Sequence, residues 1–387
     1  MPTQYYVQHS FTTPNEDITD DLLDNLDSPT PIDNLVLYFG EGEYFLSEPV
    51  TINVNCNVLI KGCGKDVTKL TLLEGDPFVI EDTRITIKGS SNQRISVEIC
   101  NINISTPDHS TIWWDSVEKH LIKIEYADDV KIHDIISRCS NAVCTNIDMR
   151  VCSNIFVTGC ELVNYNNSNA GGVLWMRHET CNVRITNNRI VKYGNDEMLA
   201  FWLPNDAPQN VQPSAGIKEN IIIADNDIVY EKPIWASDLI AGVQISLFND
   251  YNASNPNVDV VPTKFSNFCF VNNRILISAP ITNLIGITFG SNDTHDRIVI
   301  SNNSITCTDT SSAHNSNFAL ISVTDKSSCH VPVIVEDNVI TSAATTTDLM
   351  ATATALFSAL PIVLLRQPIM YLPAFIEKST ISRWVCQ

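Results

Sequence analysis

The sequence predicts an all-β chain whose parallel strands stack in successive coils, and three observations favour this fold class. A pattern of alternating apolar and polar residues followed by Asn returns along the chain; Val183 to Ile190 (VRITNNRI) and Ile221 to Ile228 (IIIADNDI) are two copies. Equivalent positions fall at 102, 135, 160, 188, 226, 273, 303 and 338, so the interval ranges from 25 residues (135 to 160) to 47 (226 to 273). The chain is also 44% hydrophobic and only 18% charged, which provides for a large core. Strand-like segments repeating at such intervals are the signature of a solenoid.

The second Asn of the pattern keeps its place in five copies, as Asn188, Asn226, Asn273, Asn303 and Asn338. Asn adopts the left-handed backbone conformation more readily than most residues, and its side chain bonds to nearby backbone groups. We therefore expect these residues to turn the chain between two strands. Their amides are also expected to bond to one another as a ladder along the stacked coils.

Residues 1–34 form an N-terminal segment, in which the sequence predicts a short helix over residues 13–27 (TPNEDITDDLLDNLD). Asn15 is a candidate N-cap, acidic residues crowd the first turn, and the apolar residues at 18, 22, 23 and 26 share one face. We expect the helix to lie over the open end of the solenoid and to shield its strand edges.

Residues 35–72 contain three short apolar segments separated by turn signals. The first leads into a Gly-Glu-Gly-Glu-Tyr turn, Pro49 precedes the second, and the third ends at Gly62 and Gly64. Glycine suits turns that need a positive φ or a close approach of two backbones. The segment therefore has the composition of one coil built from β-strands.

This segment resembles the opening coils of the pectate-lyase-like right-handed parallel β-helix superfamily, which includes the tail-spike proteins of bacteriophages. The shared features are a Tyr-Phe-x-x-Gly-x-Tyr strand and turn, an Ile/Val-rich strand and a Gly-x-Gly turn. They are carried here by Tyr38, Phe39, Gly42, Tyr44, Gly62 and Gly64. Together with the Asn-bearing repeats, the resemblance covers residues 35–341 and implies one domain, a right-handed single-stranded parallel β-helix.

A second family of apolar strands follows the Asn turns and is expected to stack as a continuous parallel sheet. Its members lie at 173–176, 198–201, 243–247, 286–289 and 319–323. Long insertions at 203–219 and 248–264 are expected to project as loops. Binding groups tend to sit on such loops and on the exposed surface beside them.

Residues 342–387 depart from the repeat pattern and form an atypical tail. The apolar run at 350–365 is 16 residues long and contains Pro361, so it falls short of the roughly 20 apolar residues of a spanning helix. We favour a C-terminal cap or an oligomerisation contact, with a membrane-active segment and a disordered end as the alternatives.

Charge and cysteine content restrict the partners. The 44 acidic against 24 basic side chains give a net charge of −20, which repels nucleic acid and anionic membranes.

The 12 cysteines include no C-x-x-C pair. Most are therefore expected to pack as buried thiols, with disulfides left open. No metal and no other cofactor is predicted. The opening residues lack a secretory signal, which predicts synthesis in a cytoplasm and a place in a virion.

The strongest polar cluster joins Arg177-His178-Glu179 to Asp196-Glu197 on consecutive coils. Glycan hydrolysis uses two carboxyl groups, about 5 to 5.5 Å apart for retention or about 6.5 to 9.5 Å apart for inversion. Stacked coils offer such spacings. Because neighbouring residues of a strand face opposite ways, Asp196 and Glu197 would form the pair only on a turn.

Otherwise one of these two acids would partner Glu179 or Asp238 across a loop. His178 would then carry the proton, and Arg177 would bind an anionic sugar. The alternative interpretation of the whole cluster is a solvated turn with a local ion pair.

Trp113 and Trp114 form a second candidate site, because exposed indole rings stack on sugars. Buried indole rings would only close the column of stacked coils.

The resemblance transfers no catalytic residue, because the Asn-Thr-Asp, Gly-His-Gly and Arg-Ile-Lys motifs of its polygalacturonases do not occur here. The sequence therefore favours a virion or tail-spike-like protein, a homotrimer beside other virion proteins, that recognises and in one version depolymerises a surface glycan. The alternatives are a cellular polysaccharide lyase or glycoside hydrolase and a purely structural particle protein. Fold alone does not decide among them.

Overall fold

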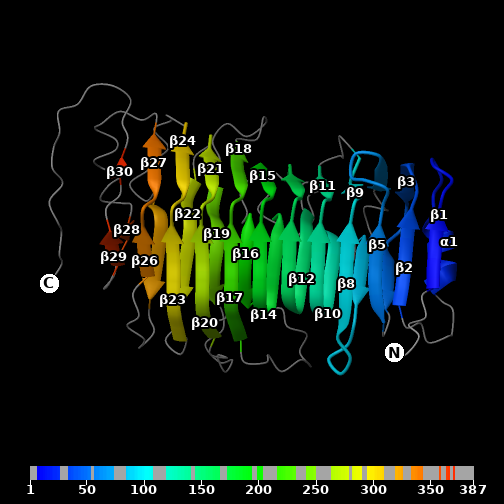
Figure 1. The fold of residues 1–387 in the computed structure, drawn as a ribbon, viewed down its shortest axis with the longest axis horizontal. Coiled ribbons are helices and arrows are strands. Elements are labelled where there is room, and N and C mark those ends of the chain that lie inside the picture. Colours follow the sequence, from blue (N-terminus) through cyan, green and yellow to red (C-terminus); the bar gives the residue numbers. More distant parts are fainter. Residues whose placement is uncertain are drawn as a thin grey trace.

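The structure is a computed structural model, and it describes the chain in segments separated by gaps. These segments are residues 7–26, 34–53, 56–73, 84–107, 119–140, 144–165, 172–193, 198–203, 216–231, 241–249, 263–278, 281–289, 294–308, 319–325, 333–342, 357–358, 363–366 and 369–370. Over these residues the chain is nearly all β, in two long parallel sheets of 19 and 11 strands. The strands lie side by side along one axis, with β1 near one end and β28 to β30 at the other (Figure 1).

The larger sheet contains two rows of strands, because its three longest strands each pass a corner and contribute to both rows. The corners are marked by residues with positive φ, among them Tyr126, Val151 and His178. We call the row before the corner the first face. It consists of β4 (Val50–Asn53), β7 (Ile85–Lys88), the amino-terminal halves of β10 (Lys119–His133), β12 (Cys144–Thr158) and β14 (Leu174–Thr186), then β16 (Leu199–Leu203), β19 (Ala241–Asn249), β22 (Ile281–Phe289), β25 (Ala319–Asp325) and β28 (Phe357–Ser358).

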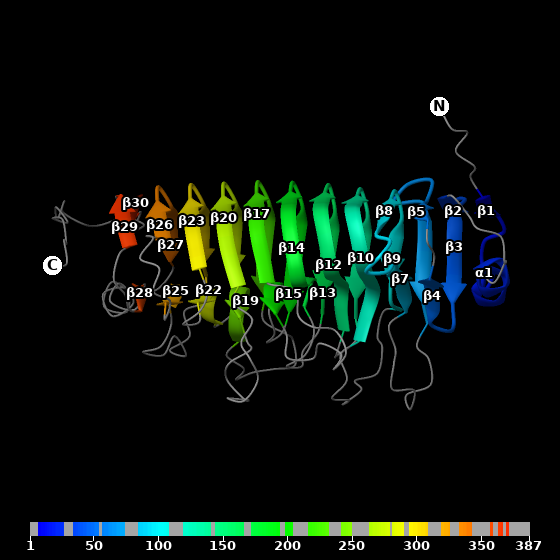
Figure 2. The same ribbon diagram turned by 90° about the horizontal axis from the view of Figure 1, so that it is seen from below.

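The row after the corner is the second face, whose strands stand in one line in Figure 2. It consists of β1 (Val7–Phe11), β2 (Asn34–Phe39), β5 (Asn57–Lys61), β8 (Ile95–Cys100), the carboxyl-terminal halves of β10, β12 and β14, then β17 (Gly216–Ala224), β20 (Thr263–Val271), β23 (Thr294–Ser301), β26 (Val333–Glu336) and β29 (Val363–Arg366).

The smaller sheet is the third face, and the chain reaches it through a tight turn from the second face. It consists of β3 (Gly42–Leu46), β6 (Thr68–Leu72), β9 (Asn103–Ser105), β11 (Ile136–Cys139), β13 (Glu161–Asn164), β15 (Arg189–Tyr193), β18 (Asp227–Glu231), β21 (Arg274–Ile277), β24 (Ser304–Cys307), β27 (Val339–Ser342) and β30 (Ile369–Met370). From β4 onward the faces recur in the same order along the chain, an arrangement consistent with a parallel β-helix.

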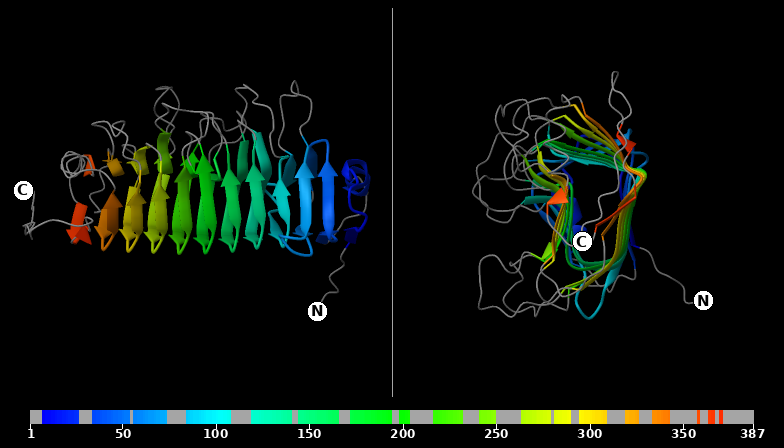
Figure 3. Two further views of the ribbon diagram at one scale, coloured as in Figure 1. Left: turned by 90° about the horizontal axis from the view of Figure 1, so that it is seen from above. Right: turned by 90° about the vertical axis from the view of Figure 1, so that its left-hand side faces the viewer.

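The core lies between the faces, because alternate residues of each strand point inward. Ile185, Ile223, Phe270 and Ile300 illustrate this, since they are partners in register on successive strands of the second face and are all fully buried. Seen end on, the strands lie behind one another around a common interior (Figure 3). The inward side chains of neighbouring parallel strands thus cover one another, which is consistent with the predicted solenoid.

The turn between the second and third faces carries the predicted ladder of Asn side chains. Asn226 shows the recurring arrangement: its Oδ1 accepts from the backbone N–H and the Nδ2 of Asn188, both at 3.0 Å, and its Nδ2 donates to Asn273 Oδ1 at 3.0 Å and to Ile185 O at 2.8 Å. Asn303 and Asn338 continue the ladder.

The turning residue, however, is the one before each ladder Asn. The φ angles are 57° at Asn187, 58° at Asp225 and 57° at Asn272, whereas the ladder residues are not among those with positive φ. The expectation that the second Asn turns the chain was therefore wrong by one position. The first residue of the pair adopts the left-handed conformation, and the second supplies the buried amide.

Gly42 and Gly62 occupy turn positions of the opening segment that favour glycine. Gly42 has a φ of 120°, which favours glycine, and a Cβ at Gly62 would collide with the carbonyl oxygen of Asn101 in the next coil. Of the cysteines in or beside the repeat frames, Cys100, Cys160 and Cys307 are buried, as expected for small apolar side chains, whereas Cys269 is partly exposed. Cys152 and Cys160 are buried and form no disulfide, and burial raises the pKa of their thiols to about 12 and about 11.

The N-terminal segment contains β1, which pairs with β2, and helix α1 (Thr19–Leu26). The helix begins later than predicted, and the side chain of Asp17 accepts a hydrogen bond from the backbone N–H of Thr19 at 3.0 Å. Ile18 and Leu22 are buried in the core cluster, and α1 lies at the same end of the molecule as β1 (Figure 2).

At the other end, the sheets extend past the boundary expected at residue 341. That boundary falls inside β27, and β28, β29 and β30 pair with β25, β26 and β27. Most of the apolar run at 350–365 lies outside the described residues. Within the described ranges, no helix combines the length and the hydropathy that a membrane span requires.

Candidate functional site

Charged side chains gather on the outer surface of the first face, over β7, β10, β12 and β14. Inward positions of these strands are apolar, such as Ile122 and Ile124 on β10, so the residues between them point outward. Those outward residues include Lys88 on β7, Lys123 and Glu125 on β10, Asp148 and Arg150 on β12, and Trp175 and Arg177 on β14. We call these seven side chains, together with His120 at the start of β10, the outer-face cluster.

Asp148 and Arg177 form the centre of the outer-face cluster. Arg177 donates from Nε to Asp148 Oδ1 at 2.9 Å and from its Nη2 to Asp148 Oδ2 at 2.8 Å, the bidentate geometry that suits a guanidinium and a carboxylate. Both side chains are 0% exposed. Arg150, on the same strand as Asp148, adds a further bond from Nε to Oδ2 at 2.8 Å. Burial alone would raise the pKa of Asp148, but the guanidinium groups of Arg177 and Arg150 hold it well below its usual range.

An imidazole and an indole complete the buried part of the cluster. The ring of His120 accepts at Nε2 from Arg177 Nη2 at 3.3 Å, since burial, followed by the charges of Arg177, Arg150 and Lys123, lowers the pKa of His120 to about 3. The ring therefore stays neutral at physiological pH. Trp175 lies edge-on to His120, with centroids 6.2 Å apart, and the Arg177 guanidinium carbon lies 5.0 Å from the centre of a Trp175 ring.

The rest of the cluster reaches solvent. Glu125 is paired with Lys123 at 2.8 Å and with Lys88 on the neighbouring strand at 3.4 Å. Burial opposes ionisation of Glu125, but its hydrogen bond to Lys123 and the charges of Lys123, Lys88 and Arg150 outweigh burial and lower its pKa. Lys123, Glu125 and Arg150 are partly exposed, and Lys88 is exposed. These side chains therefore form a rim that a ligand could contact, above a buried centre that fixes the position of Arg150.

This arrangement suits binding better than acid catalysis. A glycosidase keeps one carboxyl protonated near neutral pH by raising its pKa. Both carboxyl groups of the outer-face cluster have lowered pKa values, so both stay ionised. The cluster also holds four basic side chains, Lys88, Lys123, Arg150 and Arg177, against two acidic ones, in a chain whose net charge is −20. This local excess of positive charge favours an anionic ligand.

The residues singled out from the sequence lie in different surroundings. Arg177 belongs to the cluster, but its guanidinium is fully buried against Asp148, so it does not present itself to a surface sugar as expected. His178 and Glu179 lie instead at the corner between the first and second faces, where His178 has a φ of 63°. Glu179 Oε2 is 3.3 Å from Arg94 Nη2, which is the local ion pair that the sequence left open as the alternative.

The remaining candidates, Asp196, Glu197, Asp238, Trp113 and Trp114, lie outside the described residues. Conversely, sequence reasoning missed Asp148 and His120, which contact Arg177 across 29 and 57 residues of sequence. A polar residue between two apolar ones, as in Ile147-Asp148-Met149, is the only signal of an outward side chain in such a strand.

Comparison with known proteins identifies no family. No family model matches the chain, and no curated protein matches it. Among solved structures, DFA-IIIase from Arthrobacter chlorophenolicus A6 is 12% identical with a TM-score of 0.49, with 92% of each chain covered. The same protein in complex with GF2 is 11% identical with a TM-score of 0.47, with 92% of this chain and 91% of that one covered.

A third similar structure is ORF18 of Geobacillus virus E2, which is 10% identical with a TM-score of 0.46. This similarity covers 94% of this chain and 60% of that one, so this chain spans about three fifths of the viral protein. At TM-scores below 0.5, all three likenesses are too distant to carry an argument about function.

Proposed function

We propose that this chain is a right-handed parallel β-helix protein, with α1 covering one end, that recognises an acidic glycan on the outer surface of its first face. The observation that carries the proposal is the excess of basic over acidic side chains in the outer-face cluster of an otherwise strongly acidic chain. Ammonium and guanidinium groups bind carboxylates through charge-assisted hydrogen bonds, so a sugar polymer bearing uronic acids is the ligand class that fits.

The proposed contacts come from the partly exposed rim. Lys123 and Arg150 lie on adjacent strands, two residues apart in register, since Lys123 pairs with Asp148. Adjacent parallel strands are about 4.8 Å apart, so the two bases can reach neighbouring acidic groups of one sugar chain. The buried Asp148, Arg177 and His120 would act as positioning residues, because they hold Arg150 without facing solvent.

Recognition is favoured over cleavage because both carboxyl groups of the cluster remain ionised. The alternative, a cellular polysaccharide lyase or glycoside hydrolase, would use Asp196 or Glu197 as its acid, Glu179 or Asp238 as the partner carboxyl group and His178 as the proton carrier. A place in a virion as a trimeric, tail-spike-like component belongs to the same proposal and is supported by the resemblance of residues 35–341. A purely structural particle protein is the third possibility.

A panel of acidic and neutral polysaccharides tests these roles together. Binding of an acidic polysaccharide without release of reducing ends or unsaturated sugars is the expected result. Release of reducing ends or unsaturated sugars that is lost in Asp196→Ala or Glu197→Ala would show that the chain is an enzyme rather than a binding protein. Neither binding nor release across the panel would reject both in favour of a structural role.

Light scattering tests the trimer separately. The expected mass is three times that of the chain, and deletion of residues 342–387 should lower it if the C-terminal residues form the contact. A monomeric mass for the full chain would reject the trimer without affecting glycan recognition.

A further inference from the structure

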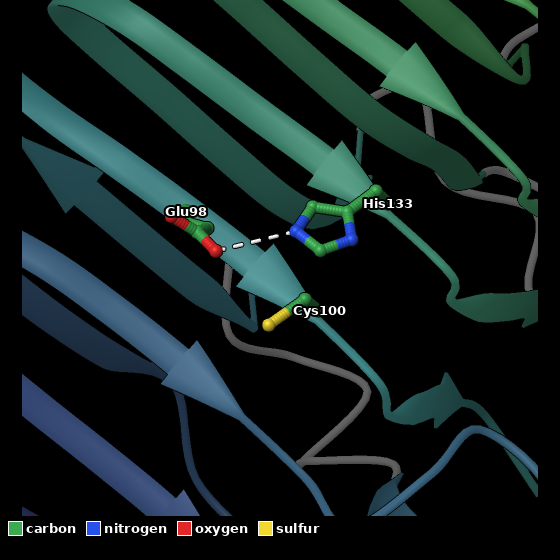
Figure 4. A group of neighbouring side chains, drawn as sticks. All are labelled: Glu98, Cys100 and His133. Atoms are coloured by element: carbon green, nitrogen blue, oxygen red, sulfur yellow. Dashed lines mark hydrogen bonds and ion pairs between the residues drawn. The ribbon is translucent and has the colours of Figure 1, made fainter.

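A second cluster of chemically reactive side chains lies on the outer surface of the second face, away from the outer-face cluster. Glu98 and Cys100 are two residues apart on β8, so they point to the same side of the sheet. His133, on β10, is the register partner of Cys100. Figure 4 shows the three side chains on the two neighbouring strands, with Glu98 directed toward His133 and Cys100 beside them.

The three side chains have the spacing of a metal site. Glu98 Oε1 is 3.2 Å from His133 Nε2, and one donor atom of each residue, including Cys100 Sγ, lies within 4.8 Å of the others. Zinc binds nitrogen and oxygen ligands at about 2.0 to 2.1 Å in tetrahedral geometry, which places two such ligands roughly 3.3 Å apart. The Glu98 to His133 distance already matches this value, and Cys100 Sγ lies within 4.8 Å of both donor atoms.

A neighbouring carboxylate orients the imidazole. Asp134 Oδ2 lies 3.0 Å from His133 Nδ1, which leaves Nε2 on the side of Glu98. Metal-binding histidines commonly use their second nitrogen in this way, because the carboxylate fixes the tautomer and increases the basicity of the ligand nitrogen. Asp134 would therefore be a second-sphere partner rather than a ligand.

The site is closed on one side and open on the other. Cys100 is buried, whereas the side chains of Glu98 and His133 are 41% and 30% exposed. A surface hollow of about 200 Å³ reaches the site at Glu98 and is also lined by Ser96, Asp129 and Lys131. Three protein ligands beside such a hollow leave one position for water or a further ligand.

We propose that Glu98, Cys100 and His133 bind a divalent cation of the zinc class, with the fourth coordination position directed to solvent. Thiolate and imidazole ligands together select zinc rather than calcium or magnesium, which prefer oxygen. Lys61 and Lys131, the register partners of Cys100 and Glu98, oppose a cation, but the charges of the Glu98 carboxylate, the Cys100 thiolate and Asp134 outweigh them.

The test is a titration of the full chain with Co²⁺, which reports a thiolate ligand through a charge-transfer absorption and tetrahedral geometry through its visible bands. The wild type should bind one equivalent with both signals, and zinc should displace it. Cys100→Ser should lose the charge-transfer band, and Glu98→Gln and His133→Gln should weaken binding at least tenfold. Asp134→Asn should weaken it by about 10- to 100-fold, as expected for a second-sphere partner.

Cys269→Ser is the matched control, because Cys269 is a partly exposed thiol on the same face and forms no disulfide; it should behave as the wild type does. A charge-transfer band retained in Cys100→Ser, or absent from the wild type, would overturn the proposal. Because a substituted chain can fail to fold, wild-type crystals soaked in zinc provide a second measurement. An anomalous peak among the three side chains is expected, and its absence would also overturn the site.

Discussion

At the scale of single residues, two similar Asp–Arg ion pairs differ in how far water reaches them. Asp148 and Arg177 are completely buried and compensate each other, whereas the similar pair of Asp227 and Arg274 lies at the surface with Arg274 76% exposed. A buried charge that loses its partner keeps its full desolvation cost, whereas an exposed charge is resolvated by water. Loss of the arginine therefore costs more stability at the buried pair than at the exposed pair.

Arg177→Gln should lower the free energy of unfolding by about 3 kcal/mol or more, because the substitution leaves Asp148 buried with Arg150 alone. Arg274→Gln removes an arginine that also makes two bonds to one aspartate, and it should cost much less, because this pair lies at the surface in contact with water. Chemical denaturation of both variants measures the difference. Equal costs would show that burial of the Arg177 pair has been misjudged.

Lys218 is a buried lysine whose Nζ donates to Met176 O at 3.0 Å and to Thr180 Oγ1 at 2.9 Å, and among the described residues no carboxylate hydrogen-bonds to it. Burial lowers its pKa from 10.5 to about 7, so between pH 7 and 10.5 the unfolded chain binds more protons at this residue than the folded chain. Stability contributed by this group must therefore rise with pH across that window and be lost as the pH falls to 7.

Relative to Lys218→Met, the wild type should gain stability on the order of 4 kcal/mol between pH 7 and 10.5, since one pKa unit is worth about 1.4 kcal/mol. Denaturant titrations at several pH values measure this difference in slope. Lys264→Met, which removes an exposed lysine from the neighbouring strand β20, should keep the wild-type slope. Parallel pH profiles for the wild type and Lys218→Met would contradict the buried, neutral lysine.

At the scale of elements, the turn between the second and third faces was the part most accessible from sequence. Asn and Asp residues recur there because one position needs a left-handed backbone and the next needs a buried amide, and both demands leave a visible pattern. A second ladder at the corner between the first and second faces, which includes Asn182, Asn220 and Asn267, was not predicted. Its residues directly precede the repeated motif, six residues before Asn188, Asn226 and Asn273, but the motif as defined began one residue later.

Asn226→Ala should lower the free energy of unfolding by about 3 kcal/mol or more, because it leaves the carbonyl of Ile185 and two donors of Asn188 unpaired in the core. Asn220→Gly is the control. Asn220 makes the corresponding amide bonds at the exposed corner with a φ of 54°, which glycine adopts without strain. It should cost less than about 1 kcal/mol. A cost equal to that of Asn226→Ala would contradict the claim that burial makes the ladder bonds important for stability.

Register explains why the outer-face cluster escaped prediction. The repeat frames at 160 and 188 differ by 28 residues, which would pair Asp148 with Met176, an inward residue. The actual partner of Asp148 is Trp175, because the pairing of β12 with β14 shifts by one residue between Arg150 and Cys152. A shift of one residue exchanges the two faces of a strand, so counting by repeat frames would give Asp148 the wrong neighbours. Frames 102 and 135, by contrast, correctly place His133 beside Cys100.

At the scale of the whole molecule, the alternating repeats predicted the long parallel sheets, because burial of an apolar stripe depends only on local periodicity. The extent of the sheets was predicted less well, since β1 and β28 to β30 lie outside the expected range of 35–341. Those strands lack the Asn motif that defined the range. For function the sequence offered only a class as an expectation, because the proposed site depends on contacts between residues far apart in the sequence.

The net charge of −20 sets the condition under which the proposed site operates. Most of the surface repels an acidic polymer, so binding must depend on the few basic groups at the rim of the outer-face cluster. At physiological ionic strength, salt largely screens the attraction between exposed charges that lie more than about 8 Å apart. Affinity for an acidic glycan should therefore fall as salt is added.

Calorimetric titration with a uronic acid oligosaccharide, and with the same oligosaccharide after reduction of its carboxyl groups, tests glycan recognition most directly. Lys123→Gln combined with Arg150→Gln should weaken binding of the acidic sugar at least tenfold, as should carboxyl reduction, because each charge-assisted bond is worth about 1.5 to 3 kcal/mol. Lys264→Gln combined with Arg274→Gln, which removes one lysine and one arginine elsewhere on the molecule, should leave affinity unchanged. Equal affinity for the acidic and reduced sugars, or equal losses in the two double variants, would contradict the assignment of the first face as the binding surface.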